Sequence, residues 1–213
     1  MRRSAAAAIA LVLLVACSSS KPKSAASTTG QTTTTYGGAL PLATGPAPWP
    51  LPDHEIERTV AAGVPVYTSE SLFYHVHAHL DVFVDGKVVT VPAGLGTSPT
   101  LHREVQQGHE LVYAPRTPCD QPCIAALHTH DDSGVLHTES DKQKLNTLGE
   151  VFVEWGVRFD GTCVGGYCPP QTTIAVYVDG TQVTTDPRQI ALTNGKEIAI
   201  VIGPPPSEIP KDF

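Results

Sequence analysis

The sequence predicts an α+β domain that is mostly β, and three observations support this class. Residues 75–84 alternate polar and apolar side chains, as a strand with one buried face does. Asp-Gly pairs at 85–86 and 179–180 stand between runs of β-branched residues, a pattern typical of two-residue hairpins. Helical signals are confined to short segments, so we expect about six strands and one or two helices.

The first residues have the composition of an export signal. Arg2 and Arg3 precede an apolar run, Ala5–Ala16, which is shorter than the roughly 20 residues that span a membrane. Residues 14–17, LVAC, resemble a bacterial lipobox. That resemblance implies a lipoprotein signal peptide over residues 1–16 and lipid attachment at Cys17. An ordinary signal peptide, in which this cysteine is incidental, is the alternative.

A tether is expected to follow the signal peptide. Residues 17–52 are rich in Ser, Thr, Ala and Pro, and such a segment buries too little apolar surface to offset the entropy of ordering it. We expect a single extracytoplasmic domain over residues 53–213, held at the membrane by its N-terminal lipid. Asp53 is a candidate N-cap for a helix over residues 54–62, which Gly63 would end.

Charge limits the partners of this chain. It has 14 basic and 21 acidic residues and a formal charge of −7. Loss of Arg2 and Arg3 with the signal peptide would leave 12 basic residues and a charge of −9. Nucleic acid is therefore not expected as a partner, because binding to phosphates requires basic surface.

Four cysteines lie in the predicted domain, at positions 119, 123, 163 and 168. An even number in an exported chain indicates two disulfides, and the sequence leaves all three pairings open. A zinc or copper site with thiolate ligands is the competing interpretation, but oxidising surroundings disfavour free thiols.

One hairpin pattern occurs twice in the sequence. LDVFVDGKVVT begins at Leu80 and IAVYVDGTQVT begins at Ile174, with apolar residues at matching alternate positions. In this alignment the positions of His75, His77 and His79 correspond to Pro169, Gln171 and Thr173. The scaffold therefore does not require imidazoles, which favours a functional role for them.

Further elements are expected between and after these units. Residues 131–134, DDSG, indicate the turn of a central histidine-bearing hairpin. Thr147 and Glu150 form a candidate capping box for a helix that continues through residues 148–157. The apolar segment at 196–202 predicts a last strand.

Strand geometry decides which histidines can share an ion. Residues two apart lie on one face about 6.6 Å from each other, and residues four apart about 13 Å. Neighbours among His75, His77 and His79 can therefore chelate together, but all three cannot bind one ion. A solvated polar face is the competing interpretation of any single His-x-His pair.

The central hairpin offers a second group. A regular antiparallel register places His128 opposite His137 and His130 opposite Val135, with the three rings on one face. Opposed Cβ atoms are about 5 Å apart, which allows two imidazoles to hold one ion. Packed against the face of His77 and His79, this hairpin would complete a site.

Imidazole donors favour zinc or copper over calcium or magnesium. Asp81 or Asp131 could orient a ring or add a ligand, and Glu139 shares a strand face with His137. His54, His102 and His109 lack this spacing and are not expected to take part.

Three stretches, HVHAHLDVFVDG, LHTHDDSGVLHTES and TLGEVFVEWG, begin at His75, Leu127 and Thr147. They resemble motifs of a family of exported or membrane-anchored bacterial and archaeal proteins with no established activity. The resemblance covers residues 74–157 and implies a shared histidine-bearing domain, without a substrate. Thr138 departs from the hydrophobic residue that family members often have there, and the cysteines are not part of the motifs.

Three functions are consistent with these observations. The first is a lipid-anchored protein that captures, stores or delivers zinc or copper ions. The second is a metal-dependent enzyme, either a hydrolase or a copper oxidoreductase, with Glu139 or Asp131 as general base. The third is a structural or adhesive surface domain in which the histidines are incidental. The sequence contains no evident nucleophile, which favours the first over the second.

Overall fold

The computed structural model describes residues 40–98 and 118–213, together with the backbone of 102–107 and 110–115. The predicted signal peptide, Cys17 and the tether as far as residue 39 lie outside these ranges, as does His109. Over the ranges described, no helix has both the length and the apolar character needed to cross a membrane.

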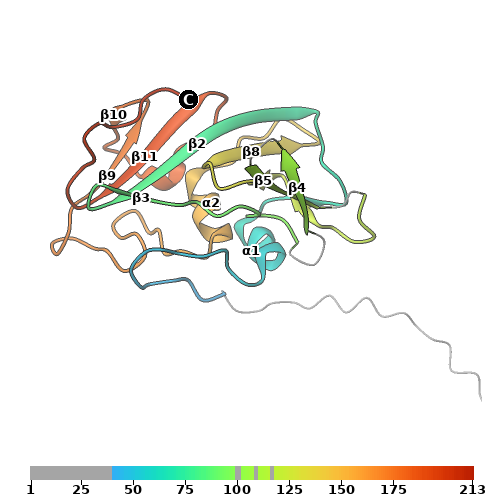
Figure 1. Ribbon diagram of the computed structural model, residues 1–213, viewed down its shortest axis with the longest axis horizontal. Coiled ribbons are helices and arrows are strands. Elements are labelled where there is room, and N and C mark those ends of the chain that lie inside the picture. Colours follow the sequence, from blue (N-terminus) through green and yellow to red (C-terminus); the bar gives the residue numbers. More distant parts are fainter. Residues whose placement is uncertain (1–39, 99–101, 108–109, 116–117) are drawn as a thin grey trace, which may run out of the picture. The chain divides into compact units, whose positions relative to one another are not determined.

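A seven-stranded sheet forms the centre of the fold (Figure 1). Its hydrogen-bonded order is β10-β9-β11-β2-β8-β7, and β3 also pairs with β2. The pairing is antiparallel throughout except between β11 and β2. In chain order the strands are β2 (Tyr74–Val84), β3 (Lys87–Val89), β7 (Leu127–His128), β8 (Val135–Ser140), β9 (Ile174–Val178), β10 (Thr181–Gln182) and β11 (Lys196–Ile202).

Two small sheets accompany it. β1 (Val66–Tyr67) pairs with β6 (Ile124–Ala125), and β4 (His102–Gln107) pairs with β5 (Glu110–Pro115). With two α-helices among the described residues, the predicted α+β, mostly β class is confirmed.

The two helices differ in how well their starts were predicted. α2 (Leu148–Glu154) begins with the predicted capping box: Glu150 N–H donates to Thr147 Oγ1, and Thr147 N–H donates to Glu150 Oε2. α1 (Glu55–Ala62) ends at Gly63 as predicted. Its N-cap is His54 in a left-handed conformation, without a side-chain cap, so the prediction for Asp53 is wrong.

The two Asp-Gly turns have the same backbone conformation. Asp85 and Gly86 have φ values of 50° and 74°, and Asp179 and Gly180 have 49° and 73°. Positive φ at both positions is what a type I′ hairpin requires, and glycine adopts it without strain. β11 lies between the two hairpins because it pairs with β2 on one side and β9 on the other.

The two faces of this sheet have different roles. Ala78, Leu80 and Val82 of β2 point into the main core, which also contains Phe152 of α2 and the helix C-cap Trp155. The opposite face of β2 begins with the histidines, continues through Asp81 and ends in a small apolar cluster of Phe83, Ala199 and Val201, packed against Tyr177 and Ile209. Alternation along one strand therefore separates the core from the polar site.

The ordered domain begins before residue 53. Trp49 is only 4% exposed and meets Trp155 edge to face, with ring centroids 5.8 Å apart. Trp155 Nε1–H donates to the carbonyl of Trp49, and Ala43 N–H donates to the carbonyl of Gly156. Residues 40–52, assigned above to the tether, thus pack on the domain, because burial of a large aromatic ring offsets the entropy of ordering them.

Both disulfides join cysteines that are close in sequence. Cys119 is bonded to Cys123, and Cys163 to Cys168. Of the three pairings that the sequence left open, the structure has the local one. These four sulfur atoms are therefore not thiolates, and the alternative of a cysteine-ligated metal site does not apply to this state.

Candidate metal centre

Three histidines form a row across three neighbouring strands. His77 of β2 pairs with His137 of β8, and His137 pairs with His128 of β7. The predicted opposition of His128 and His137 is confirmed. Because directly paired residues project from the same face, the three rings stand side by side.

Each His-x-His pair brings two nitrogen atoms together. Nε2 of His75 lies 2.8 Å from Nε2 of His77, and Nε2 of His128 lies 3.2 Å from Nε2 of His130. The His137 ring lies between the pairs, with its centroid 4.4 Å from that of His77 and 4.6 Å from that of His130. Five imidazoles from two distant segments thus share one surface.

Glu139 lies beneath these rings. It pairs with His75 in the β2–β8 register, and its Oε1 is 3.1 Å from His75 Nε2 and 3.3 Å from His137 Nδ1. The side chain is buried, and Oε2 has no hydrogen-bond partner within the part of the chain that the structure describes. Burial raises the pKa of Glu139, but the hydrogen bond with His137 and the fields of His128 and His75 outweigh burial and lower the pKa below its usual value.

His128 is held neutral and aimed at the cluster. Its Nδ1–H donates to the carbonyl of Ala125 at 2.9 Å. Burial, reinforced by the charge of His130, lowers the pKa of His128 to about 3. The lone pair is therefore on Nε2, which faces His130. An imidazole oriented through its other nitrogen in this way is a typical metal ligand.

The geometry provides two overlapping sets of donor atoms. One set is His75, His77, His137 and Glu139, and the other is His128, His130, His137 and Glu139; within each set the donor atoms lie within 4.8 Å of one another. Ligands about 2.0–2.1 Å from a tetrahedral zinc ion lie roughly 3.3 Å apart. Small adjustments of the rings would therefore close either set around an ion.

His79 belongs to a different arrangement on the same face. Its Nδ1 lies 2.9 Å from Glu197 Oε2, and its Nε2 lies 2.7 Å from the carbonyl oxygen of Ser133. Both partners accept hydrogen bonds, so both ring nitrogens donate and the ring is an imidazolium. The hydrogen bond with Glu197 raises the pKa of His79, although burial opposes it.

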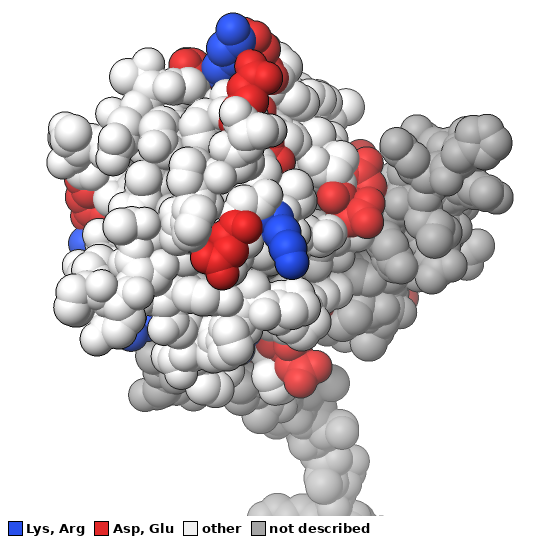
Figure 2. Space-filling model, turned by 60° about the vertical axis from the view of Figure 1, so that its left-hand side comes forward, with Lys and Arg blue, Asp and Glu red and all other residues white. Residues whose placement is uncertain are grey.

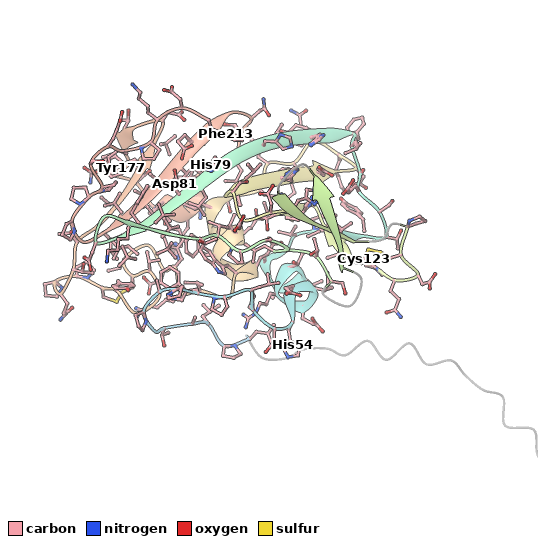
Figure 3. All side chains as sticks on the ribbon, viewed as in Figure 1. His54, His79, Asp81, Cys123, Tyr177 and Phe213 are labelled. Carbon is pink, nitrogen blue, oxygen red and sulfur yellow. A yellow bond between two sulfur atoms is a disulfide. The ribbon has the colours of Figure 1, made fainter. Side chains whose placement is uncertain are left out.

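Two further residues complete this arrangement. The ring of Phe213 stacks on His79 with centroids 5.2 Å apart, and Asp81 Oδ2 lies 3.8 Å from His79 Nδ1 (Figure 3). His79, Asp81 and Glu197 could supply three donor atoms. However, a ring whose two nitrogens both donate has no lone pair to offer an ion.

Three geometric expectations need correction. His79 pairs with Val135 of β8 and contacts the turn at Ser133, but it does not join His77 in the imidazole cluster. His75 takes that place, because β2 pairs with β8 through His75 and Glu139. His130 is not paired with Val135, since the β7–β8 ladder ends at His128 and His137.

Asp131 is the third correction. It accepts hydrogen bonds from the backbone N–H and the hydroxyl of Ser133, so it shapes the turn and orients no ring.

Two acidic neighbours were missed by sequence reasoning. Glu197 is a single buried acid in the apolar strand KEIAIVI, and that exception to the pattern was the available signal. Glu70 Oε1 lies 3.8 Å from His130 Nε2. Its position in an irregular segment gave no periodic signal.

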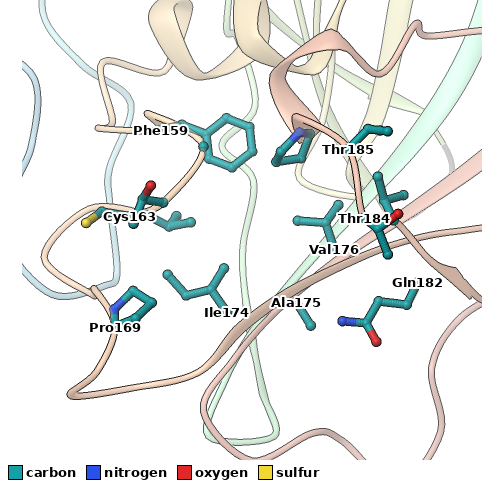
Figure 4. Close-up of a pocket in the computed structure, with 14 residues that line it drawn as sticks. Phe159, Cys163, Pro169, Ile174, Ala175, Val176, Gln182, Thr184 and Thr185 are labelled. Carbon is teal, nitrogen blue, oxygen red and sulfur yellow. The ribbon is translucent and has the colours of Figure 1, made fainter.

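The surface elsewhere differs from this centre. On the face drawn in Figure 2, basic side chains are few and stand among acidic and uncharged ones. A cavity of about 290 Å³ lies between β9 and the segment that holds Cys163 (Figure 4). Its lining consists of apolar and uncharged polar side chains, so it offers neither imidazole nor carboxylate.

The histidine cluster thus combines five imidazoles and a buried carboxylate that could hold a metal ion. Comparisons with protein-family models, with curated proteins and with solved structures found no match for this chain.

Proposed function

We propose that this chain is a lipid-anchored, extracytoplasmic protein that binds zinc or copper and captures, stores or delivers the ion. One observation carries the proposal. The lone pair of a neutral, buried His128 points into a group of imidazoles that converge above the buried carboxylate of Glu139. This is a set of electron-pair donors around a common centre.

Hydrogen bonds do not satisfy all the polar atoms of this cluster, and a bound cation would. Nε2 of His75 faces both His77 Nε2 and Glu139 Oε1, and a single N–H serves two acceptors poorly. A buried carboxylate oxygen without a partner costs about 1–3 kcal/mol or more. A metal ion accepts electron pairs from all these atoms at once and compensates the charge of Glu139.

Protonation of the histidines would compensate the charge of Glu139 less well than a metal ion would. Burial, followed by the charges of His137 and His75, lowers the pKa of His77. Together with the pKa of His128 at about 3, this favours the neutral form of these two rings near pH 7, in which each has a lone pair available. Several imidazoles with one carboxylate suit zinc and copper, whereas calcium and magnesium prefer oxygen donors.

A metalloenzyme is the second candidate, and one observation favours it. The side chain of His75 is 37% exposed, so the rim of the cluster reaches solvent. An ion held there could keep a water ligand, which hydrolases and copper oxidoreductases need. A bound ion with a slowly exchanging, closed coordination shell would favour storage instead.

The test is metal binding by the chain purified without a polyhistidine tag. We expect metal analysis to find zinc or copper, and calorimetric titration of the stripped protein to show binding that His137→Ala severely weakens. His54→Ala is the matched control, because His54 is exposed and lies beside α1. A stripped protein that binds neither ion, or equal effects of both substitutions, would contradict the proposal.

A further inference from the structure

We infer that the cluster holds two ions rather than one, bridged by Glu139. This inference deepens the proposed metal-binding function and rests on it. The starting point is the number of donors. Five imidazoles and one carboxylate converge, whereas a tetrahedral ion takes four ligands. A single ion would leave two donors of the cluster without a role.

The donors divide into two halves around a shared middle. His75 and His77 form one pair of nitrogens, and His128 and His130 form another. His137 and Glu139 occur in both candidate sets. Each His-x-His pair is therefore one half of a site, and the two halves meet at the same two residues of β8.

Glu139 has the properties that a bridging carboxylate needs. Its Oε1 lies against His75 and His137, on the side of the first pair. Its Oε2 is buried and has no hydrogen-bond partner among the described residues. Oε1 can thus bind one ion and Oε2 the other. This would place the ions about 3.5–4 Å apart, as in other two-metal sites.

The two halves are unequal in exposure. His128 is 1% exposed, and its tautomer is fixed by Ala125. The side chain of His75 is 37% exposed and lies near the start of β2. We therefore expect an inner ion at His128 and His130 that is bound first and released slowly, and an outer ion at His75 and His77 that exchanges more readily.

Such an arrangement suits delivery. The outer ion would be within reach of an acceptor at the surface, while the inner ion, fixed by a preorganised ring, would keep Glu139 in place. The set of His79, Asp81 and Glu197 does not supply the second metal position, since both nitrogens of His79 already donate to Ser133 and Glu197.

Counting ions tests this inference. We expect native mass spectrometry of the stripped, untagged chain to show two zinc ions, with the second dissociation constant at least tenfold above the first. His75→Gln with His77→Gln should leave one ion, and so should His128→Gln with His130→Gln. Glu139→Gln should weaken the second ion by at least tenfold. Asp81→Asn is the matched control and should keep both ions.

A second measurement requires no variant and so does not depend on whether variants fold. With two equivalents of Cu²⁺, electron paramagnetic resonance of the wild-type chain should show a spin-coupled pair and less integrated intensity than two isolated ions. Two uncoupled signals, one ion at saturation, or loss of an ion in Asp81→Asn would overturn the bridged site. Absence of any bound ion would instead overturn the proposed function.

Discussion

Two buried glutamates on the same face of the sheet meet histidines in different ways. Glu197 is 2% exposed and Glu139 is 4% exposed, and in the described ranges each has one carboxylate oxygen without a hydrogen-bond partner. At Glu197 a single ring, His79, donates from both nitrogens and carries the positive charge. At Glu139 several rings converge, and the most buried of them, His128, is held neutral.

The difference shows that proximity of histidine and carboxylate does not by itself define a metal site. What matters is where each ring's second nitrogen points. Nε2 of His79 donates to the carbonyl of Ser133, so it has no lone pair for an ion. Nδ1 of His128 donates to the carbonyl of Ala125, which leaves the lone pair on Nε2, facing the other imidazoles. The first arrangement is a closed ion pair, and the second is open to a cation.

The largest expected effect would separate the two arrangements by affinity. His128→Ala should lower the affinity for the inner zinc ion by at least about 100-fold, because it removes a preorganised ligand that belongs to only one of the two donor sets. His79→Ala should leave the affinity within about threefold of wild type, since its ring offers no lone pair. Calorimetric titration against a competing chelator measures both, and equal losses would mean that the two arrangements are alike.

For His79→Ala we expect a large effect on stability, in contrast to its small effect on metal affinity. His79→Ala removes the partner of buried Glu197, so the free energy of unfolding of the metal-free protein should fall by about 2–3 kcal/mol. The value is at the low end for a buried pair because the His79 side chain is 17% exposed. Denaturant unfolding provides the measurement. A loss below about 0.5 kcal/mol would show that this ion pair is not structural.

A third buried carboxyl extends the comparison to a group that keeps its proton. Burial raises the pKa of Glu55 from 4.5 to about 7. Between these values the folded state binds more protons than the unfolded state, so this stabilising contribution is present below pH 4.5 and is lost as pH rises to about 7.

Glu55→Gln should remove this dependence. Wild type should lose about 1–3 kcal/mol of stability relative to the variant between pH 4.5 and pH 7.5. Chemical unfolding of both proteins at the two pH values measures the difference, which cancels the contribution of other groups, including buried Glu154. A difference that stays constant with pH would show that Glu55 ionises normally in the folded protein.

The smallest effect is expected at a histidine outside both arrangements. His54→Ala should change the free energy of unfolding by less than about 0.5 kcal/mol and leave metal affinity unaltered. Its Nδ1 lies 4.0 Å from Glu57 Oε1, and its side chain is 55% exposed. Thermal unfolding with and without zinc checks both points, and a reduced metal-induced shift would extend the site beyond the sheet.

Local geometry was predictable from the sequence where the chain itself sets it. Alternation over β2 fixed which residues share a face, and a short turn between β7 and β8 placed His128 opposite His137. The capping box of α2 likewise depends on residues three apart. In each case the interacting residues are close in sequence, so few arrangements compete.

Pairings between distant segments were not predictable in the same way. The choice of His75 over His79 follows from the register of β2 on β8, strands more than fifty residues apart. The position of Trp49 in the core also depends on a distant partner, Trp155. No local pattern encodes the register, because a shift by two residues keeps every side chain on its face. No local pattern encodes the contact of Trp49 with Trp155 either.

The most direct test of the central claim, that this cluster binds metal through imidazole nitrogens, is X-ray absorption at the zinc edge of the loaded, untagged chain. We expect an average of about two or three imidazole ligands per ion, with nitrogen and oxygen atoms about 2.0–2.1 Å from zinc. His128→Ala should lower that number. A spectrum of zinc bound to water and carboxylates alone, unchanged in this variant, would contradict the claim.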